Sequence, residues 1–576
     1  MFIIRGKEMR KLSNGISNYE DIVREDRLYV DKTMYIEKIE NLSDKTIMFL
    51  RPRKFGKTLF TSTLECYYDI NKKDKFEELF GNTYIGKNPT ENRNKYCILR
   101  FNFSGISTEN IEETIKGFKN STIESIKLFI AKYNLDFYIN ESQEAEEILN
   151  SLYTAFQIQK ANEKIYVIID EYDHFANELL GFRTDEFKNL IAKNGKIRKW
   201  YEILKKGTET VIDRIFITGV SPVTLDSTTS GFNIANDITK NILFNDMLGF
   251  SKDDVIYLMN ELEIPKEKQK ELLPIMKTNY DGYIFSNMIR ENLENYKMYN
   301  SNMTLYFLEA YKQQNEIPKE LVDLNIISDY GKIEAFMDLC QNMNKIDILE
   351  KIVAGDLIES SLTEKFNAEI QFGEKELISL LFYLGYLTIK EIGFSKYKFQ
   401  IPNDVIKEIY SNYFLEYISR KANIVIDSID TEKVNKELLL EWKIDKLLDV
   451  LKEFLTNLSN RDYQRFDEKY VKIIFYSICR MLGTLYVKSE LELSGQYADI
   501  LLVPKEKLKE RYSILIEFKY IKQEDYDKDN SLLKNKQKQA RIQLETYKRS
   551  EEITMLPKLK SYSIVVIKDK IFIEEV

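Results

Sequence analysis

The sequence contains little histidine and cysteine, and these shortages exclude several classes of protein. Among its 576 residues there is 1 histidine, His174, so a site that needs several imidazoles, such as an HExxH zinc centre, is excluded. Its 4 cysteines are far apart in the chain, which excludes a disulfide scaffold and a CxxC zinc site. Any catalysis would therefore use carboxylates, lysine and a metal ion. His174 itself is expected to be an ordinary polar residue and not a catalytic base.

Long apolar runs are also missing. No stretch of about 18 apolar residues occurs that could cross a bilayer, and the short apolar run at the start is too brief for the core of a signal peptide. Together with the scarce cysteines, this favours a cytoplasmic protein without a membrane partner. Hydrophobic residues make up 44% and charged residues 31%, which is typical of a folded protein and not of a disordered one.

An excess of positive charge is absent too. The 84 lysines and arginines are outnumbered by 92 acidic residues, which gives a formal net charge of -8. A protein that coats nucleic acid would more often be basic, because neutralising phosphates drives such binding. The near balance still leaves room for a basic face on one domain, so any nucleic-acid contact is expected to use a local patch.

What the sequence does contain is a phosphate-binding pattern in its first part. The apolar run Thr46–Leu50 is followed by RPRKFGKT and then by residues 59–70, whose apolar positions have helical spacing. A strand, a loop and a helix in this order point N–H groups at an anion, where Lys57 would reach the β- and γ-phosphates and Thr58 would bind Mg²⁺. This Walker A pattern has Arg51 at its first glycine position, and a lone GKT also occurs in ordinary loops. The predicted nucleotide-binding residues of the loop are Arg51, Arg53, Phe55, Gly56, Lys57 and Thr58.

A second element of such a site lies downstream. Residues 164–171 have a buried-strand pattern that ends in Asp170 and Glu171, as in a Walker B strand. Asp170 would hold Mg²⁺, and Glu171 would orient the water that attacks the γ-phosphate. The alternative is a solvated strand end, which the four apolar residues before the two carboxylates make less favourable. On the next apolar strand, Thr218 or Ser221 is a candidate sensor of the γ-phosphate.

Six segments together carry a family resemblance: Gly15-Ile-Ser-Asn-Tyr19, Tyr29-Val-Asp-Lys-Thr33, RPRKFGKT, VIIDEYDH, FITGVSPV and Tyr280-Asp-Gly-Tyr283. They resemble the AAA-ATPase-like proteins of bacteria, which are typically joined to a C-terminal PD-(D/E)XK nuclease-like domain. The resemblance covers most of the chain and implies ATP binding and hydrolysis. In that family an arginine commonly stands at the first glycine position of the loop, so Arg51 is interpreted as a family trait.

The middle of the chain reads mainly as helices. Residues 374–388 have helical spacing and run into two short strand patterns at 389–392 and 397–401. A helix followed by a two-stranded ribbon is typical of a winged-helix-like fold. Such a module can read DNA, but it also serves for docking or as a hinge. The docking or hinge role is preferred here, because lysine and glutamate are mixed at its exposed positions where a DNA reader would carry a basic stripe.

The last quarter of the chain carries a second set of chemically active residues. Its patterns predict one helix and three strands, at 466–485, 487–492, 496–503 and 512–519. Alternation along the third strand places the side chains of Glu517 and Lys519 on the same side. Asp499, on the preceding strand, would meet them where the sheet opens.

Two carboxylates and a lysine are the minimal apparatus for metal-dependent cleavage of a phosphodiester. Asp499 and Glu517 would bind Mg²⁺, which generates hydroxide and offsets charge on the phosphate, and Lys519 would position or help deprotonate the water. The outer shell of the metal could be completed by Glu468, Glu490 or Glu492. The alternative is an exposed strand edge with alternating charges, because ExK on a strand is common by itself.

Asp499, Glu517 and Lys519 resemble the residue set of the PD-(D/E)XK nuclease superfamily. A proline usually precedes the aspartate, whereas this chain has Ala498 at that position. The resemblance extends to residues 539–547, which are similar to the helix after the nuclease core in that family. Gln543 and Tyr547 occupy the recurring polar positions of this helix.

The predicted fold class is α/β, with a P-loop NTPase (AAA-like) domain, a helical and winged-helix-like middle and a C-terminal restriction-endonuclease-like α/β domain. A chain of this length is expected to form about two to four domains. The expected parts are the ATPase core, a helical lid, the helical and winged-helix-like region and the nuclease-like domain, at 1–250, 251–310, 311–440 and 441–576.

The predicted function is ATP binding and hydrolysis coupled to a Mg²⁺-dependent nuclease. DNA is the expected partner, with RNA as the alternative. One rival hypothesis is an ATP-driven regulatory or scaffold protein whose nuclease-like domain binds nucleic acid without cutting, and another is a nucleotide switch that hydrolyses poorly. Self-association is also open, because a neighbouring subunit often supplies an arginine to AAA-type sites, and spacing nominates no such arginine here.

Overall fold

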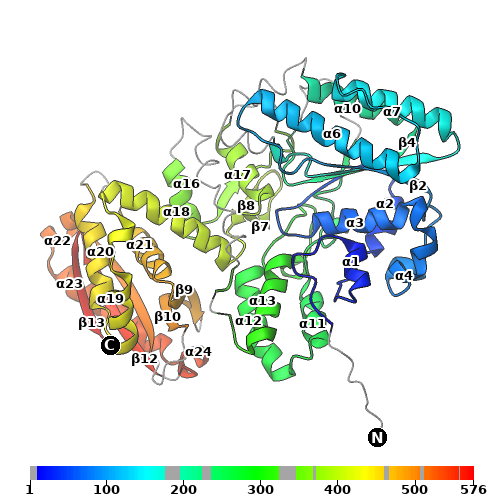
Figure 1. Cartoon of the computed structure of the whole chain (residues 1–576). Coiled ribbons are helices and arrows are strands. Elements are labelled where there is room, and N and C mark those ends of the chain that lie inside the picture. The colour runs from blue at the N-terminus through cyan, green and yellow to red at the C-terminus, as the bar shows by residue number, and fades with distance from the viewer. Residues whose placement is uncertain are drawn as a thin grey trace, which may run out of the picture. The chain divides into compact units, whose positions relative to one another are not determined.

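The structure, a computed structural model, divides the chain into two compact units, which are drawn in Figure 1. The first contains Met1–Met343 and Leu357–Val405, and the second contains Asn344–Asp356 and Ile406–Val576. The described residues are 10–175, 195–223, 235–318, 320–322, 345–366, 372–459, 463, 466–493, 495–505, 512–556 and 558–576, without the side chains of 345, 346, 490 and 492.

A five-stranded sheet forms the centre of the first unit. Its strand order is β2-β3-β4-β1-β5, and neighbouring strands are parallel. The strands read as nearly continuous apolar runs because helices cover both faces of such a sheet. The bounds are β1 Thr46–Leu50, β2 Tyr96–Asn102, β3 Lys164–Asp170, β4 Ile212–Gly219 and β5 Asn236–Asp237. Strands β1, β3 and β4 lie where the sequence predicts strands.

Helices lie on both sides of this sheet. In Figure 1, α6, α7 and α10 lie on one side of the strands, and α1, α2 and α3 lie on the other. The ring of Trp200 anchors the first group, since it packs against Phe101 of β2 and Phe118 of α6. The bounds are α1 Tyr19–Arg24, α2 Met34–Glu40, α3 Lys57–Tyr68, α4 Phe76–Phe80, α5 Tyr84–Lys87, α6 Ile111–Tyr133, α7 Ala145–Gln159 and α10 Lys196–Gly207.

Three longer helices follow the sheet along the chain. The first of them starts at a capping box, in which the Ser251 hydroxyl accepts from the Asp254 N–H and the Asp254 carboxylate accepts from the Ser251 N–H. The third starts at Asn300, whose side chain accepts from the Met303 N–H. Their bounds are α11 Lys252–Glu261, α12 Lys266–Tyr280 and α13 Ser301–Gln314.

A helix and a small antiparallel sheet complete the described part of the first unit. The helix is followed by a hairpin of two strands, so the predicted helix and ribbon are confirmed. A third strand, β6, pairs with β8 and gives the order β6-β8-β7. The bounds are β6 Ile358–Ser360, α17 Glu374–Tyr383, β7 Thr388–Ile392 and β8 Tyr397–Gln400.

The second unit is built on a mixed sheet with the order β13-β12-β11-β10-β9, in which only the β11 and β12 pairing is parallel. The ring of Phe475 in α21 packs on Phe518, whereas Leu544 and Tyr547 of α23 pack in one cluster with Leu515. Residues 515 and 518 point to opposite faces of their strand, so the two helices cover opposite faces of the sheet.

The chain enters this second unit through a run of helices, and the predicted order of one helix and three strands is confirmed by α21, β9, β10 and β11. The helix bounds are α16 Lys345–Val353, α18 Asp404–Ala422, α19 Thr431–Lys436, α20 Asp445–Asn457, α21 Glu468–Met481, α22 Gln523–Lys528, α23 Ser531–Tyr547 and α24 Glu551–Thr554. The strand bounds are β9 Leu485–Leu493, β10 Gln496–Pro504, β11 Ser513–Ile521, β12 Leu559–Ile567 and β13 Lys570–Glu575.

These elements confirm the predicted α/β class, with a parallel sheet in the first part, helices in the middle and a sheet domain at the C-terminal end. Within the described ranges, none of the helices combines the length and the apolar composition that crossing a bilayer requires.

Candidate nucleotide and metal sites

The loop of residues 51–58, the 51–58 loop, joins the end of β1 to the start of α3. Two of its residues have left-handed backbone conformations, with a φ of 67° at Lys54 and 93° at Gly56, which is the N-cap of α3. Glycine adopts this conformation without strain, which explains why Gly56 precedes the helix. The first turn of α3 thus presents free N–H groups and the positive end of the helix beside the loop.

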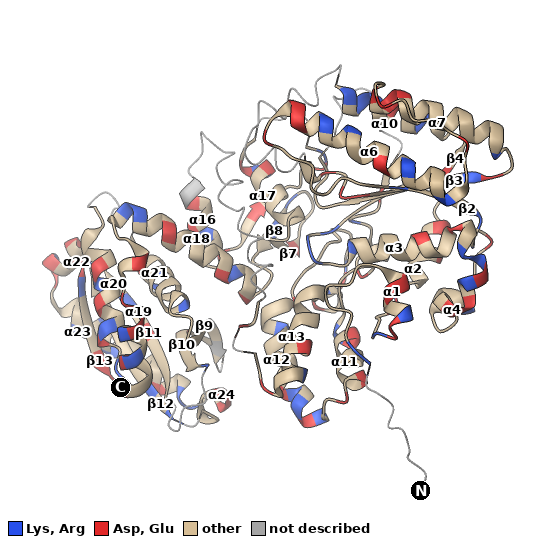
Figure 2. Cartoon of the chain, in the orientation of Figure 1, with Lys and Arg blue, Asp and Glu red and all other residues tan. Residues whose placement is uncertain are grey.

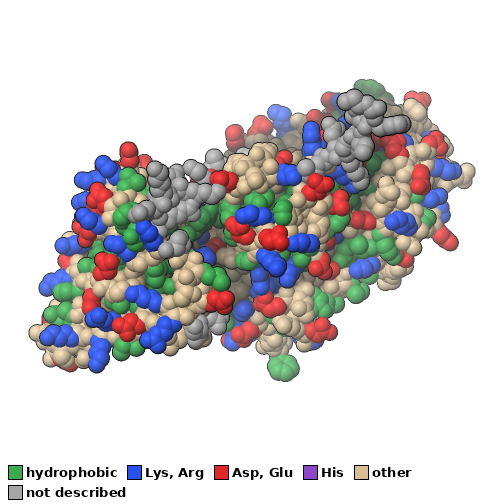
Figure 3. All heavy atoms as spheres, turned by 90° about the horizontal axis from the view of Figure 1, so that it is seen from below, with side chains coloured by type: hydrophobic (Ala, Val, Ile, Leu, Met, Phe, Trp, Pro, Cys, Tyr) green, Lys and Arg blue, Asp and Glu red, His purple; other side chains and the backbone are tan. Residues whose placement is uncertain are grey.

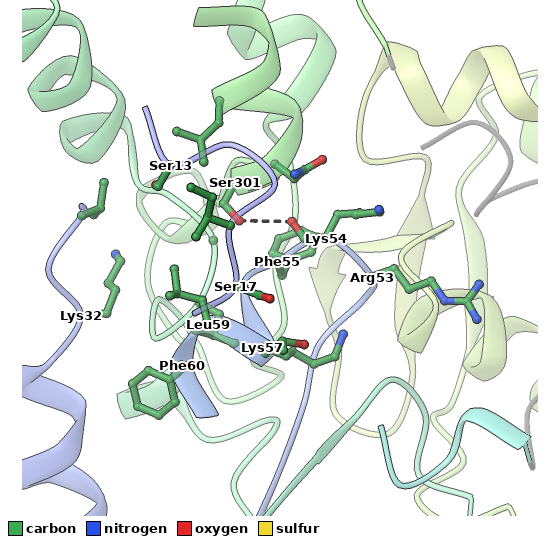
Figure 4. A pocket seen from close by; sticks show the side chains of 18 of the residues that line it. Ser13, Ser17, Lys32, Arg53, Lys54, Phe55, Lys57, Leu59, Phe60 and Ser301 are labelled. Carbon is green, nitrogen blue, oxygen red and sulfur yellow. Dashed lines mark hydrogen bonds between the residues drawn. The ribbon is translucent and has the colours of Figure 1, made fainter. Parts of the chain in front are cut away.

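The loop lines a cavity of about 540 Å³, which Figure 4 shows at close range. Its lining includes the polar residues Arg53, Lys57, Thr58, Glu171 and His174. It also includes Ile16, Tyr29, Leu248, Phe250 and Leu305. A cavity of this size with both polar and apolar lining residues suits a ligand that combines phosphates with a flat ring.

The ammonium of Lys57 is held by its own loop. It donates to the carbonyl oxygens of Arg51 and Pro52, both at 3.0 Å. Burial lowers the pKa of Lys57, and the carboxylates of Glu171 and Asp170 act in the opposite direction. Phosphate oxygens would be stronger acceptors for this ammonium than two neutral carbonyl groups.

The side chain of Arg51 lies inside the protein and does not line the cavity. It is 1% exposed, and its two terminal nitrogens donate to four main-chain carbonyl groups at 2.7 to 3.2 Å. These carbonyl groups belong to Leu50, Thr239, Phe244 and Asn245. The expectation that Arg51 binds nucleotide is therefore corrected for its guanidinium, which is used within the fold; a contact with nucleotide would come from its main chain.

Aromatic rings pack against two side chains of the 51–58 loop, those of Arg51 and Phe55. The guanidinium of Arg51 lies 4.1 Å from the ring centroids of both Phe49 and Phe285. The ring of Phe55, which is 1% exposed, packs edge-on against Tyr283 at 4.9 Å and Phe285 at 5.2 Å. Phe55 was predicted to bind nucleotide; the structure places its side chain in this cluster at the border of the cavity. The Tyr280–Tyr283 segment thus supports the loop.

Asp170 and Glu171 end β3, as the sequence predicts, but their side chains differ in exposure. Asp170 is fully buried, and its Oδ2 lies 3.4 Å from the Arg100 guanidinium and 3.4 Å from the Thr61 hydroxyl. Its Oδ1 has no hydrogen-bond partner among the described residues. A buried carboxylate oxygen without a donor is costly unless a cation or water meets it. The oxygen donors of Asp170 and Thr58 are the kind that Mg²⁺ prefers, so these residues fit the expected ion.

Glu171 has a strained backbone. Its φ of 52° lies in the left-handed region, which a residue other than glycine rarely adopts and which often marks a functional position. The side chain lines the cavity, 32% exposed, with Oε2 3.5 Å from the Nδ1 of His174. His174 therefore lies beside the predicted catalytic carboxylate, although its sequence position alone did not indicate this.

The two candidate sensors both donate hydrogen bonds inside the fold. The Thr218 hydroxyl, which is 1% exposed, donates to the Phe49 carbonyl at 2.9 Å, and the Ser221 hydroxyl donates to Asp173 at 3.1 Å. Asp173 also accepts from the main-chain N–H groups of Val220 and Ser221. The expectation of a γ-phosphate sensor stays a prediction, and both candidate hydroxyl groups already have acceptors within the fold. Asp173 ties the end of β3 to the end of β4.

Arg100 is a site residue that sequence reasoning missed. It projects from β2, pairs with Glu65 at 3.1 Å as well as with Asp170, and donates to the Thr61 hydroxyl at 3.1 Å. It lines a second cavity of about 260 Å³ that also borders Thr58. The signal was a lone arginine inside the apolar run CILRF, since an isolated charge in a buried strand needs a partner.

In the second unit, Asp499 and Glu517 lie where the β10 and β11 ladder opens, as predicted. Regular pairing ends at Ile500 and Ile516, and beyond it the Oδ2 of Asp499 accepts from the Phe518 N–H at 2.7 Å. The carboxylate thus takes the place of a strand carbonyl. Asp499 is 5% exposed and Glu517 is 1% exposed, so both carboxylates are largely removed from water.

Lys519 and Glu517 lie on one side of β11 and form an ion pair with 2.8 Å between Nζ and Oε1. Glu468 of α21 lies 3.6 Å from the same Nζ. Burial and then the charge of Asp499 raise the pKa of Glu517 to about 7. Burial opposes the charged form of Lys519, but Glu517 outweighs it and raises the pKa of the lysine. The Oε2 of Glu517 is buried without a hydrogen-bond partner among the described residues.

The donor set of this second site fits a hard divalent cation. Two carboxylates, Asp499 and Glu517, lie at the ladder opening, and one of their four oxygens, Glu517 Oε2, is buried with no donor from the described residues. Oxygen ligands of this type suit Mg²⁺. Within the described ranges, no group of three or more His, Cys, Asp or Glu gathers as a complete metal cage, so the remaining ligands would be water or substrate oxygens.

Lys472 was missed by the sequence reasoning. Its ammonium lies 2.8 Å from the Oδ1 of Asp499 and is 17% exposed. It stands four positions after Glu468 on α21, and residues spaced by four share one helix face. The sequence could therefore have indicated that Lys472 lies on the same side of the helix as Glu468.

Two further predicted residues lie on α23. Tyr547 donates to the Tyr497 carbonyl at 2.9 Å, and Gln543 lies 3.4 Å from the Tyr547 hydroxyl. The side chains of 490 and 492 lie outside the described residues.

Charge on the surface is mixed in sign. Figure 2 shows lysine and arginine interspersed with aspartate and glutamate along many helices, and the face drawn in Figure 3 also carries both signs side by side. This fits the formal net charge of -8. A nucleic acid would therefore be attracted by local groups and not by one strong field.

Two stretches of the chain match models of known families. Residues 13–229, which contain the 51–58 loop and the Asp170–Glu171 pair, match the AAA-ATPase-like family, described as a predicted AAA-ATPase. Residues 466–576, which contain the second site, match the PD-(D/E)XK nuclease superfamily. No curated protein matches the chain. The chain therefore carries an AAA-ATPase-like domain in its first part and a PD-(D/E)XK nuclease superfamily domain at its C-terminal end.

Proposed function

We propose that the first part of the chain binds and hydrolyses ATP and that the C-terminal domain is a Mg²⁺-dependent nuclease under its control. The observation that carries the nuclease half is the buried Oε2 of Glu517, for which the described part of the chain supplies no donor although Asp499 and Lys519 lie beside the same carboxylate. A domain without catalysis would gain stability from replacing this cluster by apolar residues. The buried charged cluster is therefore best explained by a catalytic role.

Each residue of the proposed ATP site would have its own role. Lys57 would leave the two loop carbonyls and pair with the β- and γ-phosphates, while the N–H groups at the start of α3 bind the same oxygens. Asp170 and Thr58 would hold Mg²⁺, which neutralises charge that develops on the phosphates. Glu171, partly exposed at the cavity wall, would orient the attacking water.

In the nuclease site Asp499 and Glu517 would hold Mg²⁺, which supplies an activated water and offsets charge on the phosphate. Lys519 would hold that water by a hydrogen bond, and its ion pair favours the ionised form of Glu517, which burial opposes. Glu468 would orient the ammonium of Lys519 from α21. The substrate class is a nucleic-acid phosphodiester, with DNA favoured and RNA as the alternative.

The nuclease half is tested by incubating the purified chain with Mg²⁺ and single-stranded DNA, double-stranded DNA or RNA, each with and without ATP. Cleavage should be lost in Asp499→Asn and Lys519→Met. It should persist in Asp449→Asn, which changes an exposed aspartate of the same unit. If the wild type binds these substrates but cuts none of them, the domain is a non-cleaving scaffold, and the nuclease proposal is wrong.

The ATPase half is tested by ATP turnover and binding. Glu171→Gln should lower turnover by about 100-fold or more while ATP still binds. Lys57→Ala should weaken ATP binding by at least about tenfold with the fold intact. Glu209→Gln, at an exposed position, should change neither. Negligible turnover already in the wild type would instead indicate a nucleotide switch.

A further inference from the structure

Both oxygens of Asp499 are engaged by donors of the chain itself. Oδ2 accepts from the Phe518 N–H, which belongs to the sheet, and Oδ1 is held by the ammonium of Lys472 at 2.8 Å. The side chain of Lys472 is 17% exposed and that of Asp499 is 6% exposed. Water therefore screens this ion pair only partly.

The Glu517 carboxylate also pairs with a lysine, but only one of its two oxygens has a donor among the described residues. Lys519 takes Oε1, and Oε2 has no donor among the described residues. With Glu468 beside Lys519, the ladder opening gathers three carboxylates and two ammonium groups. When all five groups are ionised, the two ammonium groups leave one negative charge uncompensated. A divalent cation would meet a site that is already largely neutralised.

Lys519 and Lys472 neutralise different carboxylates of the site. Lys519 contacts Glu517 and belongs to the expected nuclease set, whereas Lys472 contacts the oxygen of Asp499 that faces α21. A carboxylate oxygen has two lone pairs, so an ammonium and a metal ion could in principle share Oδ1. Their charges would then repel each other at short range in a place with little water.

We propose that Lys472 is an internal counter-ion of Asp499 and that a divalent cation must displace its ammonium to bind. This inference rests on the proposed metal site and deepens it. Lys472 is a positioning residue in the absence of metal, because it compensates the buried charge of Asp499 and holds its carboxylate in place. The site therefore binds metal less tightly than its two carboxylates alone would.

The displaced ammonium has a natural new partner. Lys472 reaches the ladder opening from α21, and a phosphate of a bound nucleic acid would bring anionic oxygens to the same opening. Each ligand then favours the other: the metal frees the ammonium for phosphate, and the phosphate accepts the ammonium that the metal expels. Such coupling is reciprocal, so nucleic acid should raise metal affinity by the same factor by which metal raises nucleic-acid affinity.

The test measures Ca²⁺ binding to the full chain by calorimetry, without nucleotide or nucleic acid, so that no turnover is needed. The binding heat that Asp499→Asn removes defines the site. Lys472→Met should bind Ca²⁺ at this site at least about tenfold more tightly than the wild type. Lys469→Met, on the same helix and 53% exposed, removes the same charge from the surface and should bind as the wild type does.

Lys472→Gln serves as a second variant, since its amide can still donate to Asp499 without a positive charge, and it should also bind more tightly. Equal or weaker Ca²⁺ binding in both variants, with Asp499-dependent binding intact in the wild type, would overturn the counter-ion role and leave the metal site standing. If no protein shows Asp499-dependent binding, the metal site itself is wrong and the proposed nuclease function falls with it.

Discussion

Gly385 lies directly against Pro52 of the 51–58 loop. A Cβ atom at Gly385 would come within 2.8 Å of the Pro52 Cβ, a distance that real Cβ atoms essentially never show. The φ of Gly385 is 84°, in the region that favours glycine. Because Gly385 follows α17, the helix-and-ribbon part of the first unit touches the 51–58 loop.

Gly385→Ala should therefore disturb both the fold and the nucleotide site. The left-handed backbone and the contact with Pro52 should together lower the free energy of unfolding by about 2–4 kcal/mol. ATP affinity should fall as well, because Pro52 must shift. Gly105→Ala is the matched control, with a φ of 76° and no atom near its added Cβ; it should cost about 1 kcal/mol and leave ATP affinity unchanged. Thermal unfolding and nucleotide titration of both variants decide the matter.

Arg51 and Arg53, two residues apart in the loop, should respond in opposite ways to replacement by methionine. Arg51→Met removes the donor from four main-chain carbonyls and should lower the free energy of unfolding by about 3 kcal/mol or more. Arg53→Met, at the cavity wall, should keep stability within about 1 kcal/mol and weaken ATP binding by about tenfold. A stable Arg51→Met that fails only in ATP binding would contradict the structural role of Arg51.

The two aspartates at the end of β3 should also separate by experiment. Asp173→Asn weakens the acceptor of two main-chain N–H groups and should lower the free energy of unfolding by about 1–3 kcal/mol. Asp170→Asn removes a buried charge with an unpaired oxygen and should leave metal-free stability within about 1 kcal/mol while abolishing Mg²⁺-dependent ATP turnover. Chemical unfolding and ATP turnover are measured side by side, and equal loss of stability in both variants would refute this assignment.

The nuclease site should depend on pH through Glu517. Because its folded pKa is raised to about 7 from 4.5, the folded state keeps a proton that the unfolded state has released. Stability without metal should therefore fall as the pH rises from about 4.5 to 7 and then level off. Glu517→Gln should remove this fall. Thermal unfolding across this range measures it, and a wild type and variant with parallel pH profiles would show that Glu517 is not the group.

The stabilisation that Ca²⁺ gives at this site should increase as the pH rises, whereas the metal-free stability falls. A metal ion needs the ionised carboxylate, so the proton on Glu517 competes with it below pH 7. The rise in unfolding temperature that Ca²⁺ produces should be small at pH 6 and larger at pH 8. The Asp499→Asn variant provides the baseline at both pH values, and an effect of Ca²⁺ that persists in it would come from another site.

Local patterns were enough to predict the frame of both sites. Strand, loop and helix around Lys57 follow one another in sequence, so their apolar spacing reports their order directly. The pairing of Glu517 with Lys519 follows from alternation along one strand. Asp499 needed one further step, the expectation that it meets the pair from the preceding strand, and β10 does lie beside β11 in antiparallel register. Predictions of this kind require only neighbours in the chain.

The hydrogen-bond partners of the Arg51 side chain could not be predicted from neighbouring residues in the chain. Its distant acceptors, Thr239 and Asn245, lie 188 and 194 positions along the chain, and only the tertiary fold brings them to the guanidinium. Thr218 has the same explanation, because its hydroxyl is taken by the neighbouring strand. A polar residue near a site was interpreted as a ligand contact when its actual partner was a main-chain carbonyl group.

The second unit is assembled from two separate stretches of the chain. Residues 344–356 belong to it together with residues 406–576, and Lys469 of α21 pairs with Asp356 of the shorter stretch. A gene fragment that encodes only the longer stretch would leave α16 behind. An exchange of this unit between related chains should therefore carry both stretches if the Lys469–Asp356 ion pair is to be kept.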